Sequence, residues 1–342
     1  MINDLAPDIA LRELLSGYWK TAVINALASL DIADVMAEAH CEASVIAAKL
    51  NLDPVGVRRL MLAGASLGVL VHEGGDRFDL TPMGQLLRAD TPGSLKAMAM
   101  HQGGDIYRAF GELAQTIRTG LPPDWIRSGA DGFADLNDNP EAAAVFNRAM
   151  ADGSVIVAER ACDAFDFGRY ARVADIGGGY GAVLAVILNR YPDLSGAVVD
   201  LDHSAEGARN YLESQGVLNR SDFVVGSFFD ELDIDADCYL LKYIIHDWPD
   251  NEALAILTRC AEAAAANDAE VVLIERLVPA QVELSLTHQN VVKADLTMLL
   301  WNGQERTLIE YEALLARAGL QLQDVVNMPD EFALMIARPI SR

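Results

Sequence analysis

The second half of the sequence alternates short apolar runs with helical stretches, and this alternation limits the fold more than any other feature. The runs of strand length are Val173–Ile176, Ala197–Val199, Phe223–Val225, Tyr239–Ile245 and Val271–Ile274. Helical patterns near residues 181–190, 204–215 and 251–266 separate them. Such βαβ units predict a parallel sheet covered by helices on both faces. The closing stretch "LQLQDVVNMPDEFALMIARP" predicts two further strands that add an antiparallel pair to the sheet.

The first half reads mainly as helices and contains the pattern of a winged helix-turn-helix. A short helix is expected at Ser44–Lys49 and a longer one at Val55–Leu67, with a hairpin around Gly74 and Gly75. DNA binding is the first function that such a module suggests. Residues 41–90, however, hold five basic and six acidic residues, a net charge of −1, with no basic stripe along the second helix. We therefore expect a structural or dimer-forming module.

Length and charge narrow the class of protein further. The 342 residues, 51% of them apolar, suffice for about two domains with substantial cores. We expect a helical domain at residues 1–165 and an α/β domain at residues 166–342. The formal charge of −24 argues against nucleic acid and anionic membrane as partners, because both bind basic surfaces. Scattered cysteines, apolar runs too short to span a membrane and an N-terminus without basic residues indicate a cytoplasmic protein.

A glycine-rich turn follows the first expected strand of the sheet. In "DIGGGYGA", which begins at Asp175, Gly177 and Gly179 allow a ligand to approach the backbone at the carboxyl edge. Asp175 suits a cationic amino group better than a pyrophosphate. Asp200, at the end of the next strand, is placed to accept hydrogen bonds from a ribose diol. The loop also fits the dinucleotide fingerprint, so an NAD-dependent dehydrogenase stays open at this point.

The third and fourth expected strands bring more polar and aromatic groups to the same edge. After the third strand, Ser227 can bond the edge of an adenine, and Phe228 or Phe229 can cover its face. Lys242 lies near this edge in the fourth strand. The fourth strand is an apolar run expected to be buried on both faces, and it ends in the tripeptide His-Asp-Trp that begins at His246.

Together these motifs resemble the S-adenosylmethionine-dependent O-methyltransferases of small aromatic molecules, a caffeate-type family with bacterial relatives in antibiotic and pigment biosynthesis. The resemblance rests on "DIGGGYG", "VVDL", "VGSFF", "LLKYIIHDW", "VVLIERLVP" and "NGQERT", and it extends over the helical first half. It implies an α/β fold with a Rossmann-like seven-stranded methyltransferase sheet and an N-terminal, mainly helical, winged-helix-like dimerisation domain. It also implies S-adenosyl-L-methionine as cofactor, S-adenosyl-L-homocysteine as product, a small aromatic acceptor and a homodimer.

The resemblance also implies roles for individual residues. His246 is the implied general base, with Glu275 and Glu305 as the acids that flank and orient it. The expected cofactor contacts are Asp175, Gly177, Gly179, Asp200, Leu201, Ser227, Phe228 and Lys242. The expected neighbours of the acceptor are His101, Phe146 and Met150, with Met298 as additional soft apolar surface. No metal site is expected, because the sequence contains no HxH or HxxxH pair.

The expected chemistry is transfer of a methyl group to a hydroxyl, most simply a phenol. An imidazole can take the phenolic proton during in-line transfer, and a carboxylate on its other nitrogen fixes the tautomer. Glu275 ends the neighbouring strand and can reach His246, whereas the position of Glu305 rests on the resemblance. Ser227-Phe228 replaces the Asp-Met usual in plant members, and His101 replaces an Asn. Alternatives are a relative that performs C- or N-methylation, hydroxylation or decarboxylation with the same cofactor, a winged-helix regulator, and the dehydrogenase.

Overall fold

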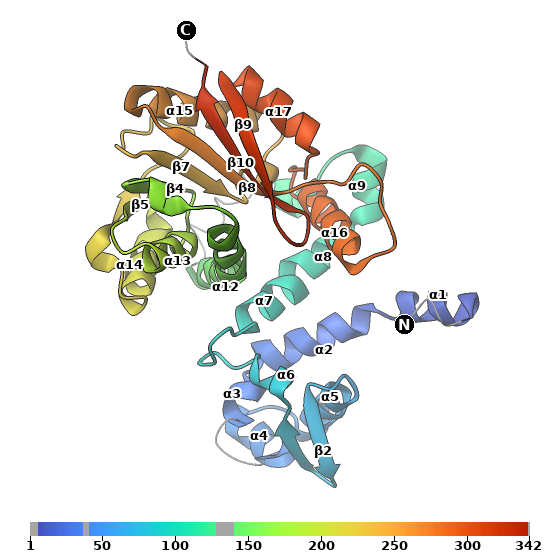
Figure 1. Cartoon of the computed structure of the whole chain (residues 1–342). Coiled ribbons are helices and arrows are strands. Elements are labelled where there is room, and N and C mark those ends of the chain that lie inside the picture. Colours follow the sequence, from blue (N-terminus) through green and yellow to red (C-terminus); the bar gives the residue numbers. More distant parts are fainter. Residues whose placement is uncertain (1–5, 37–40, 128–139, 341–342) are drawn as a thin grey trace. The chain divides into compact units, whose positions relative to one another are not determined.

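The computed structural model describes residues 6–36, 41–127 and 140–340, and the chain divides into two compact units, Met1–Arg108 and Ala109–Arg342 (Figure 1). Helix α12 (Pro140–Ala164) belongs to the second unit, because its Ala158 and Ala161 share a core with α13 (Ala182–Arg190). Residues 109–165 therefore fall in the same compact unit as the sheet. The expected boundary at residues 165 and 166 stays a prediction of where the catalytic domain begins.

The first unit is a winged helix-turn-helix module with flanking helices. Its helices are α1 (Pro7–Leu15), α2 (Tyr18–Ser29), α3 (Ile32–Met36), α4 (Ala43–Leu50), α5 (Pro54–Ser66), α6 (Pro82–Gln85), α7 (Lys96–His101) and the π-helix η2 (Gln102–Ile106). Its strands are β1 (Cys41–Glu42), β2 (Leu70–Gly74) and β3 (Arg77–Leu80), antiparallel in the order β1-β3-β2. Asp53 caps α5 by accepting a hydrogen bond from the Gly56 N–H at 2.6 Å. The expected pair of helices and the hairpin are confirmed.

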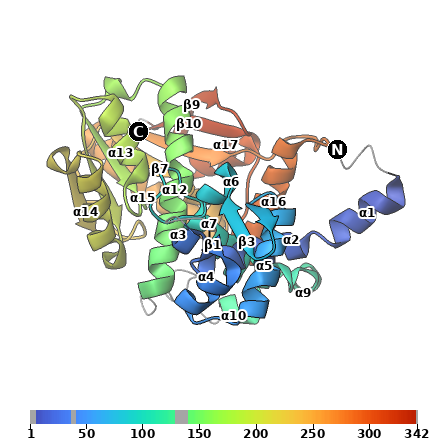
Figure 2. The ribbon, with the colours of Figure 1, turned by 90° about the horizontal axis from the view of Figure 1, so that it is seen from below.

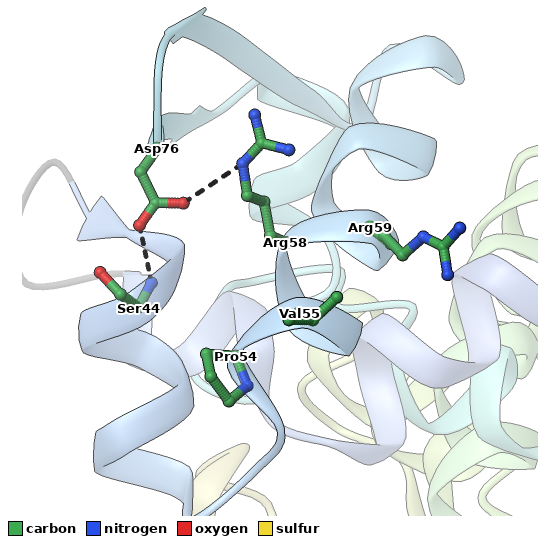
Figure 3. Close-up of a pocket in the computed structure, with 6 residues that line it drawn as sticks. All are labelled: Ser44, Pro54, Val55, Arg58, Arg59 and Asp76. Carbon is green, nitrogen blue, oxygen red and sulfur yellow. Dashed lines mark hydrogen bonds and ion pairs between the residues drawn. The ribbon is translucent and has the colours of Figure 1, made fainter.

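A shallow depression on the first unit lies beside α5 (Figure 3). It is lined by Ser44, Pro54, Val55, Arg58, Arg59 and Asp76. The Asp76 carboxylate accepts a hydrogen bond from the Ser44 N–H at 3.0 Å and lies 3.6 Å from Arg58 Nε. The hydrogen bonds from Ser44 and the charge of Arg58 lower the pKa of Asp76. Arg58 of the second helix is thus paired with a carboxylate of its own module.

The second unit is a seven-stranded sheet with helices on both faces. Its strands are β4 (Arg172–Ile176), β5 (Ser195–Asp200), β6 (Ser221–Val225), β7 (Cys238–Lys242), β8 (Glu270–Arg276), β9 (Leu320–Asn327) and β10 (Phe332–Pro339). Besides α12 and α13, its helices are α8 (Tyr107–Phe110, which spans the division), α9 (Leu113–Thr119), α10 (Asp124–Arg127), α14 (Ala205–Ser214), α15 (Asp250–Asn267), α16 (Leu286–Leu300) and α17 (Leu308–Arg317). Its described residues also form the 3-10 turns η3 (Phe167–Arg169), η4 (Asp202–Ser204), η5 (Leu218–Arg220) and η6 (Ile245–Asp247).

The strand order of the sheet is β6-β5-β4-β7-β8-β10-β9. Strands β4 to β8 are parallel, and β10 is antiparallel to both of its neighbours. The chain runs outward from β4 through β5 to β6 and then returns to β7 on the other side of β4. The carboxyl ends of β4 and β7 therefore flank the switch point at which open α/β sheets bind ligands. The expected sheet with its closing antiparallel pair is confirmed.

Alternate residues of each strand pack into two separate cores, one on each face of the sheet. Ala174 and Tyr239 point to the core shared with α15 and α17, whereas Val173 and Leu240 point to the core shared with α12, α13 and α14. Helices α12 and α13 lie side by side in both views (Figure 1, Figure 2). Because both of their faces are covered, the central strands β7 and β8 are mostly apolar and buried, and their polar residues lie near the strand ends.

Two strand boundaries near the switch point differ from the sequence expectation. Strand β7 ends at Lys242 rather than Ile245, because Tyr243 adopts a φ of 56°, which breaks the extended run. Strand β8 continues past Ile274 to Arg276. His246 is therefore carried by a separate turn after the strand, and Glu275 lies inside the sheet.

Candidate active site

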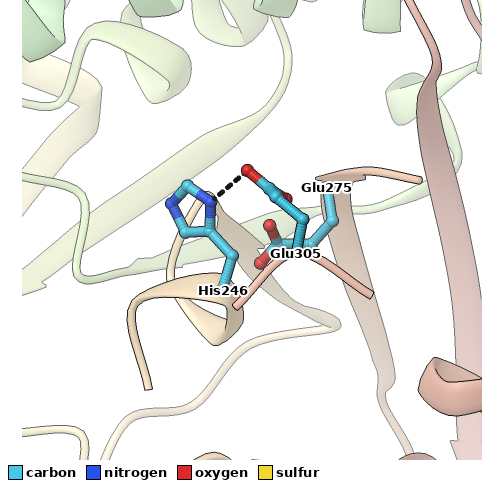
Figure 4. A group of neighbouring side chains, drawn as sticks. All are labelled: His246, Glu275 and Glu305. Carbon is cyan, nitrogen blue, oxygen red and sulfur yellow. Dashed lines mark hydrogen bonds and ion pairs between the residues drawn. The ribbon is translucent and has the colours of Figure 1, made fainter. Parts of the chain in front are cut away.

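His246 lies on η6, the single turn between β7 and α15, at the carboxyl edge of the sheet. Its side chain is buried next to Glu275 of β8 and Glu305 of the loop between α16 and α17 (Figure 4). One ligand atom from each of the three side chains lies within 4.8 Å of the other two. The three residues expected to form the catalytic group are therefore neighbours, and their roles stay a prediction.

Glu305 holds one nitrogen of the imidazole. Its Oε1 lies 2.9 Å from His246 Nδ1. Because an ionised carboxylate can only accept, this contact places a proton on Nδ1 and leaves Nε2 as the basic nitrogen of the neutral ring. The main-chain N–H of Glu305 in turn donates to Asp295 Oδ1 of α16 at 3.1 Å. The helix thus fixes the segment that orients the ring.

Glu275 acts on the backbone that leads into the turn. Its Oε1 accepts hydrogen bonds from the N–H groups of Ile244 at 3.2 Å and Ile245 at 2.9 Å. The side chain is fully buried, and Oε2 has no hydrogen-bond partner among the described residues. Glu275 therefore supports the residues in front of His246, while its second oxygen adds negative charge close to the ring.

The imidazole of His246 is stacked on an aromatic ring. The Tyr243 ring lies parallel to it, with an interplanar angle of 6° and centroids 4.4 Å apart. The positive φ of Tyr243 turns the chain so that residues 243 and 246 meet face to face. Arg276 and Lys242 flank the same tyrosine, with the guanidinium carbon 5.8 Å and Nζ 4.5 Å from its ring centroid.

The charges around His246 favour its protonated form. Burial lowers the pKa of His246, but the carboxylates of Asp247, Glu305 and Glu275 outweigh burial and raise it to about 9. Burial raises the pKa of Asp247 to about 6 and that of Glu275 to about 7. A proton taken up by the imidazole is therefore stabilised by nearby carboxylates, as a general base requires once it has acted.

The turn after β4 has the features of a binding site for an amino acid group. Asp175 is 1% exposed, and its Oδ2 has no hydrogen-bond partner among the described residues. Burial raises the pKa of this carboxyl to about 7, although Lys242 opposes the shift. A side chain added at Gly179, where φ is 56°, would meet nothing within 4 Å, so the backbone there is open to a ligand. A buried carboxylate with one oxygen left without a partner fits the ammonium group of S-adenosylmethionine.

The end of β5 is tied to this glycine turn. Asp200 Oδ2 accepts a hydrogen bond from the Gly179 N–H, and Oδ1 accepts one from the Leu201 N–H, both at 2.6 Å. Each carboxylate oxygen keeps a further lone pair for a hydroxyl donor. Burial raises the pKa of Asp200, and the two N–H groups oppose that shift. The geometry is compatible with the expected ribose contact, which stays a prediction.

Ser227 and Phe228, the expected adenine contacts, follow β6. Ser227 Oγ accepts a hydrogen bond from the Phe229 N–H at 3.2 Å and so shapes the turn. The Phe228 ring packs edge-on against Trp248, with centroids 5.9 Å apart. It also lies beside the glycine turn, since a Cβ at Gly177 would be 3.3 Å from its ring. Apolar aromatic surface is therefore present next to the loop.

Lys242 ends β7 and connects the sheet to α12. Its Nζ donates a hydrogen bond to Ser154 Oγ at 2.8 Å, and that hydroxyl donates to the Met150 carbonyl at 2.6 Å. Burial lowers the pKa of Lys242 to about 8, although Glu275 and Asp175 oppose this shift. The lysine is thus held by α12, and a direct contact with the cofactor stays a prediction.

The expected neighbours of the acceptor come from three helices. Phe146 and Met150 lie one turn apart on α12, and both are half-buried. Met298 lies on α16, where its carbonyl accepts the Gly303 N–H at 2.8 Å and so holds the loop that carries Glu305. His101 ends α7 in the first unit, where burial lowers its pKa. Their role as substrate neighbours is untested.

Comparison with known proteins decides the family. A family model described as an O-methyltransferase domain matches residues 110–321, and one described as an O-methyltransferase dimerisation domain matches residues 12–90. The chain belongs to the O-methyltransferase family. Its expected fold and enzyme class are thereby confirmed, and its relatives are enzymes that use S-adenosylmethionine.

Individual relatives of this O-methyltransferase act on different acceptor atoms. It is 34% identical to the phenazine O-methyltransferase PhzM of Lysobacter antibioticus over 96% of both chains. It is also 32% identical to the 8-amino-8-demethylriboflavin N,N-dimethyltransferase of Streptomyces davaonensis, over 92% of this chain and 91% of the relative. The crystal structure of LaPhzM superposes with a TM-score of 0.92 at 33% identity, covering 98% of this chain and all of that one.

A further solved relative shows both ligand classes of the family together. The structure of NcsB1, an O-methyltransferase from neocarzinostatin biosynthesis, contains S-adenosylmethionine and 2-hydroxy-5-methyl naphthoic acid. It is 32% identical with a TM-score of 0.80, and the match covers 96% of this chain and 98% of NcsB1. The expected cofactor is thus the one with which structures of this family are solved.

Sequence reasoning on this O-methyltransferase missed three contributors to the site. Tyr243 stacks on His246, and Asp247 Oδ1 lies 3.3 Å from His246 Nε2. Arg306 is 1% exposed and contacts the main chain of the turn. The single signal available was the position of Arg306 next to Glu305 in "NGQERT". No sequence pattern marked the positive φ of Tyr243.

Two further observations concern metal and membrane. His246, Glu275 and Glu305 are close enough for their ligand atoms to surround an ion, so the expectation that the methyltransferase has no metal site stays a prediction. In its described residues, no helix combines the length and the apolar character needed to cross a membrane.

Proposed function

We propose that the protein transfers a methyl group from S-adenosylmethionine to a hydroxyl of a small aromatic molecule, with His246 as general base. The observation that carries this proposal is the contact of Glu305 with His246 Nδ1 at 2.9 Å, which leaves Nε2 as the proton acceptor. Several relatives support an aromatic acceptor, among them enzymes that methylate a phenazine and a dihydroxynaphthoate.

When bound, S-adenosylmethionine supplies a methyl group on a positively charged sulfur, and S-adenosylhomocysteine is the product. His246 takes the proton of the acceptor hydroxyl at Nε2 as the oxygen attacks the methyl carbon. Glu305 keeps the proton on Nδ1 and stabilises the imidazolium that forms, and Asp247 adds a second carboxylate 3.3 Å from Nε2. The Tyr243 ring limits rotation of the imidazole, because it covers one face.

The cofactor is proposed to lie across the ends of β4, β5 and β6. Asp175 and the open backbone at Gly179 would hold the amino acid end, and Asp200 with Leu201 would face the ribose. Ser227 and Phe228 would face the adenine, and Lys242 would support this edge from β7. His101, Phe146, Met150 and Met298 are proposed to contact the acceptor. We also propose that the dimerisation domain makes the enzyme a homodimer.

Methylation of an aromatic amine is the second candidate, because one relative is an N,N-dimethyltransferase. A neutral amine attacks through its lone pair before it loses a proton, so it depends less on a base than a phenol does. The test is a screen of phenolic acids, naphthoates, quinols and aminophenols with S-adenosylmethionine, read by mass spectrometry. Methylation of a hydroxyl that is lost in His246→Gln supports the proposal, and methylation restricted to amines would replace it.

A further inference from the structure

The segment Gly303–Arg306 lies directly against the turn that carries His246. A Cβ at Gly303 would be 2.3 Å from the His246 carbonyl oxygen, so only glycine permits this approach. The Gln304 N–H donates a hydrogen bond to the same carbonyl at 2.8 Å. Glu305 then contacts the imidazole itself. Successive residues of one short segment thus meet the backbone and the ring of the same histidine.

The side chain of Arg306 completes this contact from within the core. It is 1% exposed, and its Nη1 donates to the Ile245 carbonyl at 2.9 Å. Its Nη2 donates to the Trp248 carbonyl at 2.8 Å. Ile245 and Trp248 flank His246 and Asp247, so the guanidinium spans the turn from one end to the other. Both of these hydrogen bonds go to main-chain carbonyls and not to the imidazole.

Asp250, at the start of α15, fixes the orientation of the guanidinium. Its Oδ1 accepts hydrogen bonds from Arg306 Nη2 at 2.9 Å and Nε at 3.1 Å, and from Gln304 Nε2 at 2.8 Å. The arginine is thereby tied to the helix that follows the turn. A planar guanidinium can serve these diverging acceptors together, whereas an ammonium group in the same place cannot.

We propose that Arg306 is a positioning residue that holds the His246 turn in register with Glu305, so that Nδ1 meets its carboxylate and Nε2 faces the acceptor. The role in catalysis rests on the proposed function, but the positioning itself does not. Because Arg306 follows Glu305 in the chain, one segment sets both the position of the ring and the position of its orienting acid.

Arg306→Lys tests this proposal, because it keeps the positive charge and removes the planar guanidinium that bonds both carbonyls and Asp250. Loosening of the turn is expected to lower the pKa of His246, since the imidazolium loses close contact with Glu305 and Asp247. NMR titration of the histidine side chains in the S-adenosylhomocysteine complex measures this shift, with His246→Gln used for assignment. With an acceptor from the screen, kcat is expected to fall about tenfold or more, with KM and the Kd of S-adenosylhomocysteine within about twofold.

Arg220 offers a matched control in the same domain. It donates hydrogen bonds to the carbonyls of Leu188 at 2.8 Å, Tyr191 at 3.3 Å and Leu194 at 2.7 Å. Arg220 directly precedes β6 and so lies at the amino end of a strand, whereas His246 lies at the carboxyl edge of the sheet. Arg220→Lys is expected to lower the Tm while the His246 pKa and kcat stay at wild-type values. An Arg306→Lys protein whose His246 titrates as in wild type would overturn the proposal.

A second, milder variant tests the proposal if Arg306→Lys does not fold. Asp250→Asn keeps the arginine and removes its counter-charge on a side chain that is 53% exposed. It is expected to move the His246 titration in the same direction by a smaller amount, and an unchanged titration would count against the proposal. The NMR titration needs no acceptor, so it tests the positioning role of Arg306 independently of the proposed function. Failure of the proposed function would instead appear as turnover that persists in His246→Gln.

Discussion

The imidazole of His246 lies parallel to the ring of Tyr243, with centroids 4.4 Å apart and an interplanar angle of 6°. This stack forms because Tyr243 leaves the extended conformation directly after β7, which folds the chain back over a single turn. The ring that is proposed to accept the proton is therefore fixed by an aromatic face as well as by a carboxylate.

Removal of the stacked ring should weaken catalysis without removing the base. Tyr243→Leu is expected to lower kcat by up to about tenfold, the equivalent of the roughly 0.5–1.5 kcal/mol that aromatic pairs contribute. Tyr243→Phe keeps the face of the ring and should stay within about twofold of wild type. Steady-state kinetics with one acceptor check both variants. Equal loss in the two would mean that the phenol hydroxyl, and not the stack, matters.

The pH dependence of catalysis should report the charge state of His246. The imidazole acts as a base only when neutral, and its pKa in the ligand-free protein is raised to about 9. We therefore expect kcat/KM to rise with pH through the neutral range, and this rise should be absent in His246→Gln.

The positive charge of the bound cofactor should lower the pKa of His246. NMR titration should therefore give a lower pKa for His246 with S-adenosylmethionine than with S-adenosylhomocysteine. Identical titrations would contradict a sulfonium bound near the ring.

The raised pKa of His246 also makes the stability of the folded protein depend on pH. The folded-state pKa of His246 lies above the ordinary value of 6.5, so the contribution of its protonation to the stability of the fold is present below pH 6.5. It is lost as the pH rises through about 9. Denaturant unfolding at pH 6 and pH 10 should therefore show a larger fall in the free energy of unfolding for wild type than for His246→Gln.

Asp175 should govern affinity for the cofactor through its buried, unpartnered oxygen. Asp175→Asn removes the negative charge with little change of shape, and it should weaken S-adenosylmethionine and S-adenosylhomocysteine alike, because both carry the amino group. We expect at least a tenfold rise in Kd by calorimetry, in line with about 1.5–3 kcal/mol for a hydrogen bond to a charged group. Asp193→Asn, an exposed change before β5, is the control. Loss for only one of the two ligands would place Asp175 elsewhere in the site.

Helix α1 should contribute to the homodimer. None of its residues is buried, and Leu11, Leu14 and Leu15 are 57%, 66% and 69% exposed. Exposed apolar surface of this kind is typical of an interface. Leu14→Glu combined with Leu15→Glu is expected to shift the protein from dimer to monomer in light scattering, whereas Leu218→Glu on the second unit should not. A wild-type monomer at micromolar concentration would contradict the proposed assembly.

The sequence was sufficient for the sheet and for the chain positions of the proposed catalytic group, but not for how that group is held. Continuous apolar runs located β4 to β8, because such runs are typical of strands buried on both faces. Glu305 was identified only through the family motif. The three-residue shift at the end of β7 depends on one backbone angle at Tyr243, which apolar periodicity does not encode. Arg306 was overlooked because its partners are main-chain carbonyls, which every residue carries.

Single-turnover methyl transfer by His246→Gln tests the central claim most directly. The variant, loaded with S-adenosylmethionine, is mixed with a phenolic acceptor from the screen, and the methylated product is quantified after rapid quenching. Since a positioned general base contributes about 10²–10⁴-fold, we predict a fall in rate of at least about a hundredfold, with the Kd of S-adenosylhomocysteine within about twofold of wild type. A wild-type rate of O-methylation in this variant would contradict the assignment of His246 as the base.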